Sequence, residues 1–161
     1  MKTAICNASP LITMAKADLL QVFPEQFSSI LVPTAVAEEI MKGPEKDPIR
    51  RQLNELPWLK QVTLEPPLAP LAFWQLGRGE AEVIELARRN QDTLALLDDK
   101  DARNAATALR IPVMGTLGLI ARSALSGRIA SFNQMVDRLK NAGIYLDARV
   151  ISQVREGLEE K

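Results

Sequence analysis

Short apolar runs alternate with longer amphipathic segments along most of this chain. The runs predict strands over 3–6, 29–32, 94–97 and 111–114, and a weaker run predicts a short strand over 61–64. Amphipathic spacing predicts helices over 11–15, 35–41, 45–56, 80–90, 99–110, 117–121, 132–142 and 147–158. Because helix-length segments separate the strands, we expect parallel pairing with helices on both faces. The predicted fold is an α/β three-layer α/β/α sandwich with a mainly parallel sheet of about four or five strands, in a single domain over 1–161.

Proline and glycine mark where these elements begin and end. Ser9-Pro10 and Pro33-Thr34 suit helix starts, and Gly43-Pro44 ends the helix predicted over 35–41. The stretch 57–72 holds four of the ten prolines, which makes it the least regular part of the chain. No repeat, low-complexity tract or linker interrupts the pattern.

The composition excludes several kinds of chemistry. The chain has no histidine, so Ser–His triads, histidine bases and histidine-bound metals are excluded. Its one cysteine, Cys6, excludes an internal disulfide and a thiolate zinc cluster. Any catalysis must use carboxylates, lysines or hydroxyl groups.

Charge and the N-terminal residues set broader expectations. The 20 basic and 20 acidic residues cancel, which argues against a broadly basic nucleic-acid-coating protein but allows a local basic patch. Polar residues interrupt the first apolar residues, so we expect neither a secretory signal nor a membrane span. Together with the unpaired cysteine, this predicts a cytoplasmic location.

The most informative polar residues are Asp98 and Asp99, directly after the strand predicted over 94–97. Ligands of open α/β sheets bind beyond the carboxyl ends of the strands, where these two acids are expected. The alternative is structural, because an aspartate at a helix start caps free N–H groups and suits the helix dipole.

Three further junctions carry similar residues, each with its own structural alternative. Asn7 follows the first strand and also suits a turn. Glu38 and Glu39 lie in the helix after the second strand, where at least one of them suits a solvated face. Glu80 opens the helix after Gly79, where the helix dipole favours an acid.

Taken together, these junctions predict a shared site at one edge of the sheet. Parallel strands bring the junctions together, and the gathered carboxylates would repel one another unless a cation lay between them. Oxygen ligands suit Mg²⁺ or Mn²⁺ better than zinc or copper.

Four motifs of the chain resemble, in the same order, those of PIN-domain proteins. They are Asn7-Ala8-Ser9-Pro10-Leu11-Ile12, Val32-Pro33-Thr34-Ala35-Val36-Ala37-Glu38-Glu39-Ile40, Gly77-Arg78-Gly79-Glu80-Ala81-Glu82 and Leu97-Asp98-Asp99-Lys100-Asp101-Ala102-Arg103. The likeness covers about residues 3–142 and is greatest to a branch similar to VapC-type toxin nucleases, which reads Gly-x-Gly-Glu, Asp-Asp-x-x-Ala-Arg and then Gly-Thr, as in Gly115-Thr116.

The resemblance implies a nuclease that hydrolyses RNA phosphodiesters with a water activated by Mg²⁺ or Mn²⁺. It maps the catalytic acids onto Glu39, Glu80 and Asp99, with Asp98 as a near-equivalent because the spacing is uncertain by one residue. The implied metal ligands are Asn7, Glu80 and Asp99, and Ser9 and Thr116 are further candidate site residues. The resemblance implies RNA as a partner and also an antitoxin protein. It further implies that the chain forms a homodimer.

One position departs from the family pattern. The first strand of the family normally ends in aspartate, and this chain has Asn7 there. Asparagine keeps a carbonyl oxygen that can bind a metal but lacks the charge, so weaker metal binding is expected. The chain is therefore either a PIN-type ribonuclease or a catalytically impaired module that binds RNA or a protein. A third reading is an α/β domain with ordinary capping acids.

The basic residues beside the predicted acids suggest how RNA would be held. Arg78, Lys100 and Arg103 neighbour those acids in sequence, and we expect them to contact phosphates. The alternative for Arg103 is that it pairs with Asp99 or Glu80 and only orders the site.

Overall fold

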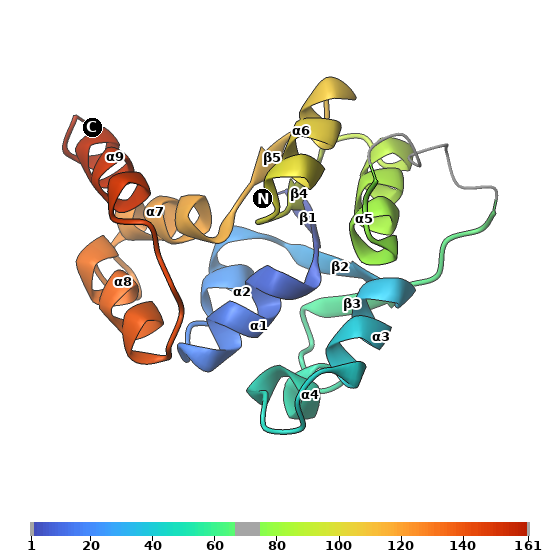
Figure 1. Ribbon diagram of the computed structural model, residues 1–161, viewed down its shortest axis with the longest axis horizontal. Helices are drawn as coiled ribbons and strands as arrows, with labels where there is room; N and C mark the ends of the chain where they lie inside the picture. Colours follow the sequence, from blue (N-terminus) through green and yellow to red (C-terminus); the bar gives the residue numbers. More distant parts are fainter. Residues whose placement is uncertain (1, 67–74, 161) are drawn as a thin grey trace.

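A five-stranded parallel sheet forms the centre of the protein in a computed structural model, which describes residues 2–66 and 75–160 (Figure 1). The strand order is β3-β2-β1-β4-β5. The strands are β1 (Thr3–Cys6), β2 (Ser29–Pro33), β3 (Leu59–Val62), β4 (Thr93–Leu96) and β5 (Val113–Met114). All four strand pairs are parallel, because helices connect the strands.

The middle of the sheet is its most buried part. In β1 and β4 the register pairs Ile5 with Ala95 and Cys6 with Leu96, and all four side chains are fully buried. Apolar residues on both faces are what a parallel sheet covered on two sides requires.

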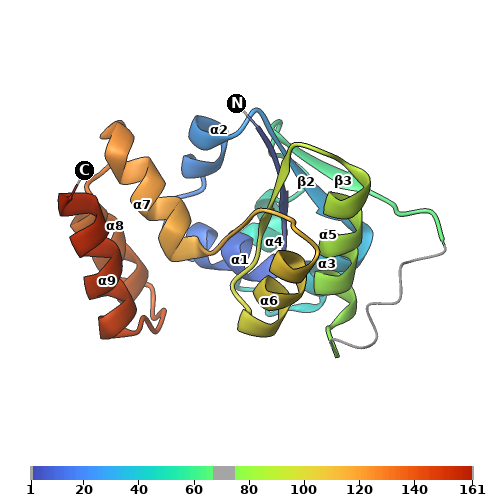
Figure 2. The same cartoon turned by 90° about the horizontal axis from the view of Figure 1, so that it is seen from above.

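Helices cover both faces, which confirms the predicted three-layer α/β/α fold (Figure 2). On one side lie α1 (Ala8–Lys16), α2 (Val22–Gln26) and α4 (Pro48–Gln52). On the other lie α5 (Arg78–Arg89), which contacts β1, β2 and β4, and α6 (Lys100–Ala108). The N-terminal part of α5 approaches α3 (Thr34–Lys42).

The last three helices gather at one side of the sheet, next to α1 and α2 (Figures 1 and 2). They are α7 (Thr116–Ser126), α8 (Phe132–Asn141) and α9 (Ala148–Glu159), and α7 contacts both of the others. No helix within 2–66 and 75–160 combines the length and the hydropathy that a membrane crossing requires.

The order of the strands creates a switch point between β1 and β4. The chain leaves β1 towards β2, but it leaves β4 towards β5, on the opposite side. The connections therefore diverge beyond the carboxyl ends of these two central strands, which is where open α/β sheets form ligand crevices. Asn7 and Asp98 lie at these two ends.

Three predicted elements differ most clearly from the structure, and one helix was missed. The strand predicted over 111–114 comprises only Val113–Met114. The helix predicted over 45–56 is wrong beyond 48–52: Pro48 has no N–H to donate and occupies the first turn, and Pro57 disfavours helix at Leu56. The strand predicted over 61–64 lies at 59–62. The five-residue α2, which contains Pro24, carried too short a pattern to be predicted. The proline-rich stretch from residue 67 lies outside the described residues.

Candidate active site

The Asp98 carboxylate joins three elements beyond the end of β4. Its Oδ2 accepts hydrogen bonds from Ser9 Oγ and Thr116 Oγ1, each at 2.8 Å. Its Oδ1 accepts the backbone N–H of Thr116 at 2.7 Å. Ser9 lies in the first turn of α1, and Thr116 begins α7. One half-buried carboxylate therefore holds the first turns of both helices against the sheet.

Asp99 and Arg103 order the turn that follows. Asp99 is exposed and is the N-cap of α6, where its Oδ2 accepts the N–H of Ala102 at 2.9 Å. Arg103 Nη1 donates to the backbone carbonyl oxygens of Leu97 and Asp98. Arg103 therefore orders the turn through carbonyl groups, and no ion pair to Asp99 or Glu80 is present in the described residues.

Asn7 presents an unpaired oxygen beyond the end of β1. Its backbone N–H donates to the carbonyl of Leu96 at 3.1 Å, and its side chain is 7% exposed. Asn7 is the N-cap residue of α1, but its side chain makes no capping hydrogen bond. Its Oδ1 is buried without a hydrogen-bond partner among the described residues. An unsatisfied buried acceptor costs about 1–3 kcal/mol, so this oxygen favours a ligand.

Three side chains pack so closely around Gly79 that a larger residue would be crowded there. A Cβ atom at this position would lie 3.0 Å from Glu39 Oε2, 3.3 Å from Val36 Cγ2 and 3.4 Å from Asn7 Oδ1. The absence of a side chain therefore lets α5 approach α3 closely. It also brings the Glu39 carboxylate and the Asn7 carbonyl to the same small space.

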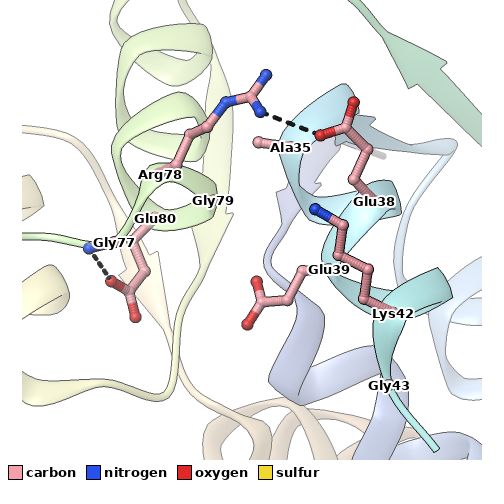
Figure 3. A pocket seen from close by; sticks show the side chains of 9 residues that line it. All are labelled: Ala35, Glu38, Glu39, Lys42, Gly43, Gly77, Arg78, Gly79 and Glu80. Carbon is pink, nitrogen blue, oxygen red and sulfur yellow. Dashed lines mark hydrogen bonds and ion pairs between the residues drawn. The ribbon is translucent and has the colours of Figure 1, made fainter.

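Glu39 and Glu80 both border a cavity of about 420 Å³ between α3 and α5 (Figure 3). Glu39 is exposed and has no hydrogen-bond or ion-pair partner among the described residues. Glu80 is folded back, and its Oε2 accepts the N–H of Gly77 at 2.9 Å, as a first-turn acid does. The two acids therefore differ, because only Glu39 is free to bind something else.

The basic residues near the candidate site differ in whether they form ion pairs. Arg78 Nη1 lies 3.0 Å from Glu38 Oε2 and its Nε 3.2 Å from Glu82 Oε2, so this side chain ties α5 to α3 (Figure 3). Lys42 also borders the cavity, and within the described residues it has no ion-pair partner. Lys100 is exposed and likewise has no such partner in 2–66 and 75–160.

A second cavity, of about 460 Å³, is bordered by Asp98. Ser9, Thr116 and Arg103 border it with Asp98. The structure thus divides most of the predicted residues between two cavities. Asn7, Asp99 and Lys100 border neither of them.

A family model described as a PIN domain matches residues 3–160, which is nearly the whole chain. The chain belongs to the PIN-domain family. Comparison with curated proteins gives no match. PIN domains are commonly nucleases and generally use divalent metal ions, so membership supports a nuclease-like or RNA-binding function.

The donor atoms of this PIN domain suit a hydrated cation better than a closed metal cage. Among the described residues, no group of three or more carboxylates or thiols is placed to hold one ion. The unpaired Asn7 Oδ1 and the nearby Glu39 carboxylate supply two oxygen donors. Mg²⁺ is usually bound through one or two carboxylates and keeps several waters, so this pair fits such an ion.

Cys6 lies directly beneath the site of this PIN domain but is a poor nucleophile. Burial raises the pKa of its thiol well above the usual value, and the negative charge of Asp98 raises it further. The thiol therefore stays protonated at neutral pH, and it donates to the carbonyl of Asn7 at 3.3 Å.

Sequence reasoning missed two features of this PIN domain. The sequence predicts only a helix start at Gly77-Arg78-Gly79, whereas in the structure Gly79 lets the backbone of α5 approach Glu39, Val36 and Asn7 closely. The second cavity is built partly from residues 144–154, which carried no polar motif that could have indicated it.

Proposed function

We propose that this PIN domain is a metal-dependent endoribonuclease that hydrolyses RNA phosphodiesters. Asn7 and Glu39 would hold the divalent ion, Mg²⁺ or Mn²⁺, on the α3–α5 side of the switch point. Asp98 positions this edge of the site. When bound, the ion would supply an activated water and offset the charge that develops on the phosphate.

One observation carries this proposal: the buried Asn7 Oδ1 lacks a hydrogen-bond partner among the described residues and lies against Gly79, next to the Glu39 carboxylate. Stability alone does not account for an unsatisfied acceptor beside an exposed, unpaired carboxylate. Bound water or a hydrated cation would satisfy both oxygens.

Glu80, Asp98 and Asp99 have other roles in this proposal. Glu80 is engaged with Gly77 N–H in the structure and would reach a metal through water. Asp98 accepts hydrogen bonds from Ser9 and Thr116, so it holds the N-terminal ends of α1 and α7 in place. Asp99 caps α6 and is the weakest of the candidate ligands.

The lysines are the first candidates for contacts with RNA phosphates. Lys42 and Lys100 have no ion-pair partners among the described residues, so they can contact RNA at no cost to an existing pair. Arg78 would have to leave Glu38 and Glu82, and Arg103 would have to leave two carbonyl groups.

A second function, an RNA- or protein-binding module without catalysis, is favoured by one residue. The family pattern has aspartate at the end of β1, and Asn7 lacks the charge that attracts a cation. In this case RNA would bind with the same groups but would not be cut.

An RNA-cleavage assay in Mn²⁺ decides between the two functions. We expect slow cleavage by the parent chain, faster cleavage by Asn7→Asp, and a loss of at least about 100-fold in Glu39→Gln. Glu38→Gln is the matched control, because Glu38 is the neighbouring exposed acid and pairs with Arg78 instead. RNA binding without cleavage by either the parent or Asn7→Asp would favour the binding module.

The wider biology stays a prediction. The resemblance to toxin nucleases predicts that induced expression slows growth and that a co-expressed antitoxin protein restores it. The single domain over 1–161, the homodimer and the cytoplasmic location are likewise predictions.

A further inference from the structure

The second cavity, which Asp98 borders, has both polar and apolar residues in its lining. Ser9, Thr13 and Thr116 belong to the polar part of the lining, with Asp98 and Arg103. The apolar part comes from α7, α9 and the segment between α8 and α9, and its members are Leu117, Ile144, Leu146, Val150 and Val154. Its volume of about 460 Å³ lies within the range of small-molecule sites.

Tyr145 stands at the border of this cavity with most of its ring in solvent. Its side chain is 88% exposed, and the neighbouring Val150 is 41% exposed. These are two of the five large apolar side chains that are exposed in the described part of the chain. An exposed aromatic ring beside an apolar wall offers a free face on which a planar group can stack.

We propose that this cavity holds a nucleobase of single-stranded RNA, stacked on Tyr145, next to the phosphodiester that is cut. The inference rests on the proposed function, which places the RNA backbone at Asn7 and Glu39. It adds a base-binding subsite in the second cavity, which Asp98 borders. Stacking on aromatic rings is how proteins commonly hold single-stranded RNA.

The charges of the lining favour a base over a phosphate. Asp98 and Asp147 border the cavity against one cation, Arg103, so an anionic group would be repelled. A neutral base avoids this repulsion, and it offers exocyclic amino groups to Asp147 and an acceptor to the hydroxyl of Thr13, so that Asp98 and Arg103 keep their bonds within the protein. The mixed lining therefore fits the polar edge and the flat face of a base together.

The sole tyrosine of the chain makes the test specific. Chains with isotope-labelled tyrosine give ring signals from Tyr145 alone, and these are followed by NMR without divalent ions, so that RNA is not cut. We expect a short single-stranded RNA to shift the Tyr145 ring signals. An abasic ribose-phosphate chain of the same length should leave them in place.

Variants of Tyr145 test how much the stacking contact contributes to RNA affinity. Tyr145→Leu should weaken RNA binding roughly tenfold, and Tyr145→Phe, which keeps the ring, should bind like the parent. Leu125→Ala is the matched control, because Leu125 is also exposed, at 54%, but lies outside the cavity. Circular dichroism checks that each variant is folded.

The outcomes separate this inference from the proposed function. Equal affinity of Tyr145→Leu and the parent, ring signals that RNA leaves unmoved, an equal response to the abasic chain, or no RNA binding would each overturn the base subsite. Tyr145-dependent binding without any cleavage in Mn²⁺ would retain the subsite and overturn the ribonuclease. Cleavage of RNA at the same rate by Tyr145→Leu and the parent would retain the ribonuclease and overturn the base subsite.

Discussion

The two sides of the switch point differ in how far their polar groups are satisfied. Asp98 accepts three hydrogen bonds, from Ser9 and from two donors of Thr116. Across β1, Asn7 Oδ1 and the Glu39 carboxylate have no partners among the described residues, although they face the same space. The Asp98 carboxylate is satisfied by the protein itself, whereas the Asn7 and Glu39 oxygens are left for a ligand.

This difference separates structure from chemistry within one set of polar residues. A carboxylate whose oxygens are bonded to the protein contributes stability and position. An unpaired carbonyl beside an exposed carboxylate lowers stability slightly but gives binding capacity. Substitutions on the Asp98 side should therefore mainly lower stability, and substitutions on the Asn7 and Glu39 side should mainly lower ligand binding.

The largest effect on stability is expected on the Asp98 side. Asp98→Asn keeps one acceptor oxygen but places an NH₂ group against the donors of Ser9 and Thr116. We expect a loss of about 3 kcal/mol in the free energy of unfolding, measured by urea denaturation. A loss below about 1 kcal/mol would mean that this carboxylate does not hold the first turns of α1 and α7.

The effect of Asn7→Asp on stability should depend on whether a divalent ion is present. Without divalent ions, a second negative charge near Glu39 in a buried position should cost about 2 kcal/mol. With millimolar Mn²⁺ the variant should recover that loss and melt at a higher temperature than in EDTA, by a larger margin than the parent. A melting temperature of the variant that Mn²⁺ leaves unmoved would contradict a metal site at Asn7.

Gly79→Ala tests whether the close approach at Gly79 matters. The new Cβ would crowd Glu39, Val36 and Asn7, so we expect a cost of about 1 kcal/mol and a smaller response to Mn²⁺. Gly157→Ala is the control: Gly157 lies within α9, and its added Cβ would meet nothing within 4 Å. That variant should be more stable than the parent by up to about 1 kcal/mol.

The smallest effect on stability is expected for Glu39→Gln. The side chain is exposed and unpaired among the described residues, so the free energy of unfolding should change by less than about 0.5 kcal/mol. The stabilisation by Mn²⁺ should fall at the same time. Strong destabilisation would place Glu39 with Asp98 as a structural residue.

The sequence predicted the sheet better than the roles of its polar residues. The strands at 3–6, 29–33 and 93–96 carry buried apolar runs, so burial alone defines them. The helix predicted over 45–56 failed because its charged residues carry no tertiary information and Pro48 and Pro57 limit it.

The different roles of Asp98 and Asp99 could not be predicted from the sequence, for another reason. The two acids are adjacent, and their roles depend on which carboxylate meets Ser9, 89 residues away, and Thr116, 18 residues away. Local pattern describes only the capping alternative, which fits Asp99. Likewise, the space at Gly79 exists only because α3 and α5 meet there.

The buried thiol of Cys6 gives a direct way to follow this region. It is the only cysteine, it is fully buried, and it is bonded to the carbonyl of Asn7. A thiol reagent can therefore react only after the ends of β1 and β4 separate, and the alkylation rate reports the population of that locally opened state. Any ligand that binds the closed site would slow alkylation in proportion to its occupancy, so mass spectrometry would yield an affinity even if the protein cuts nothing.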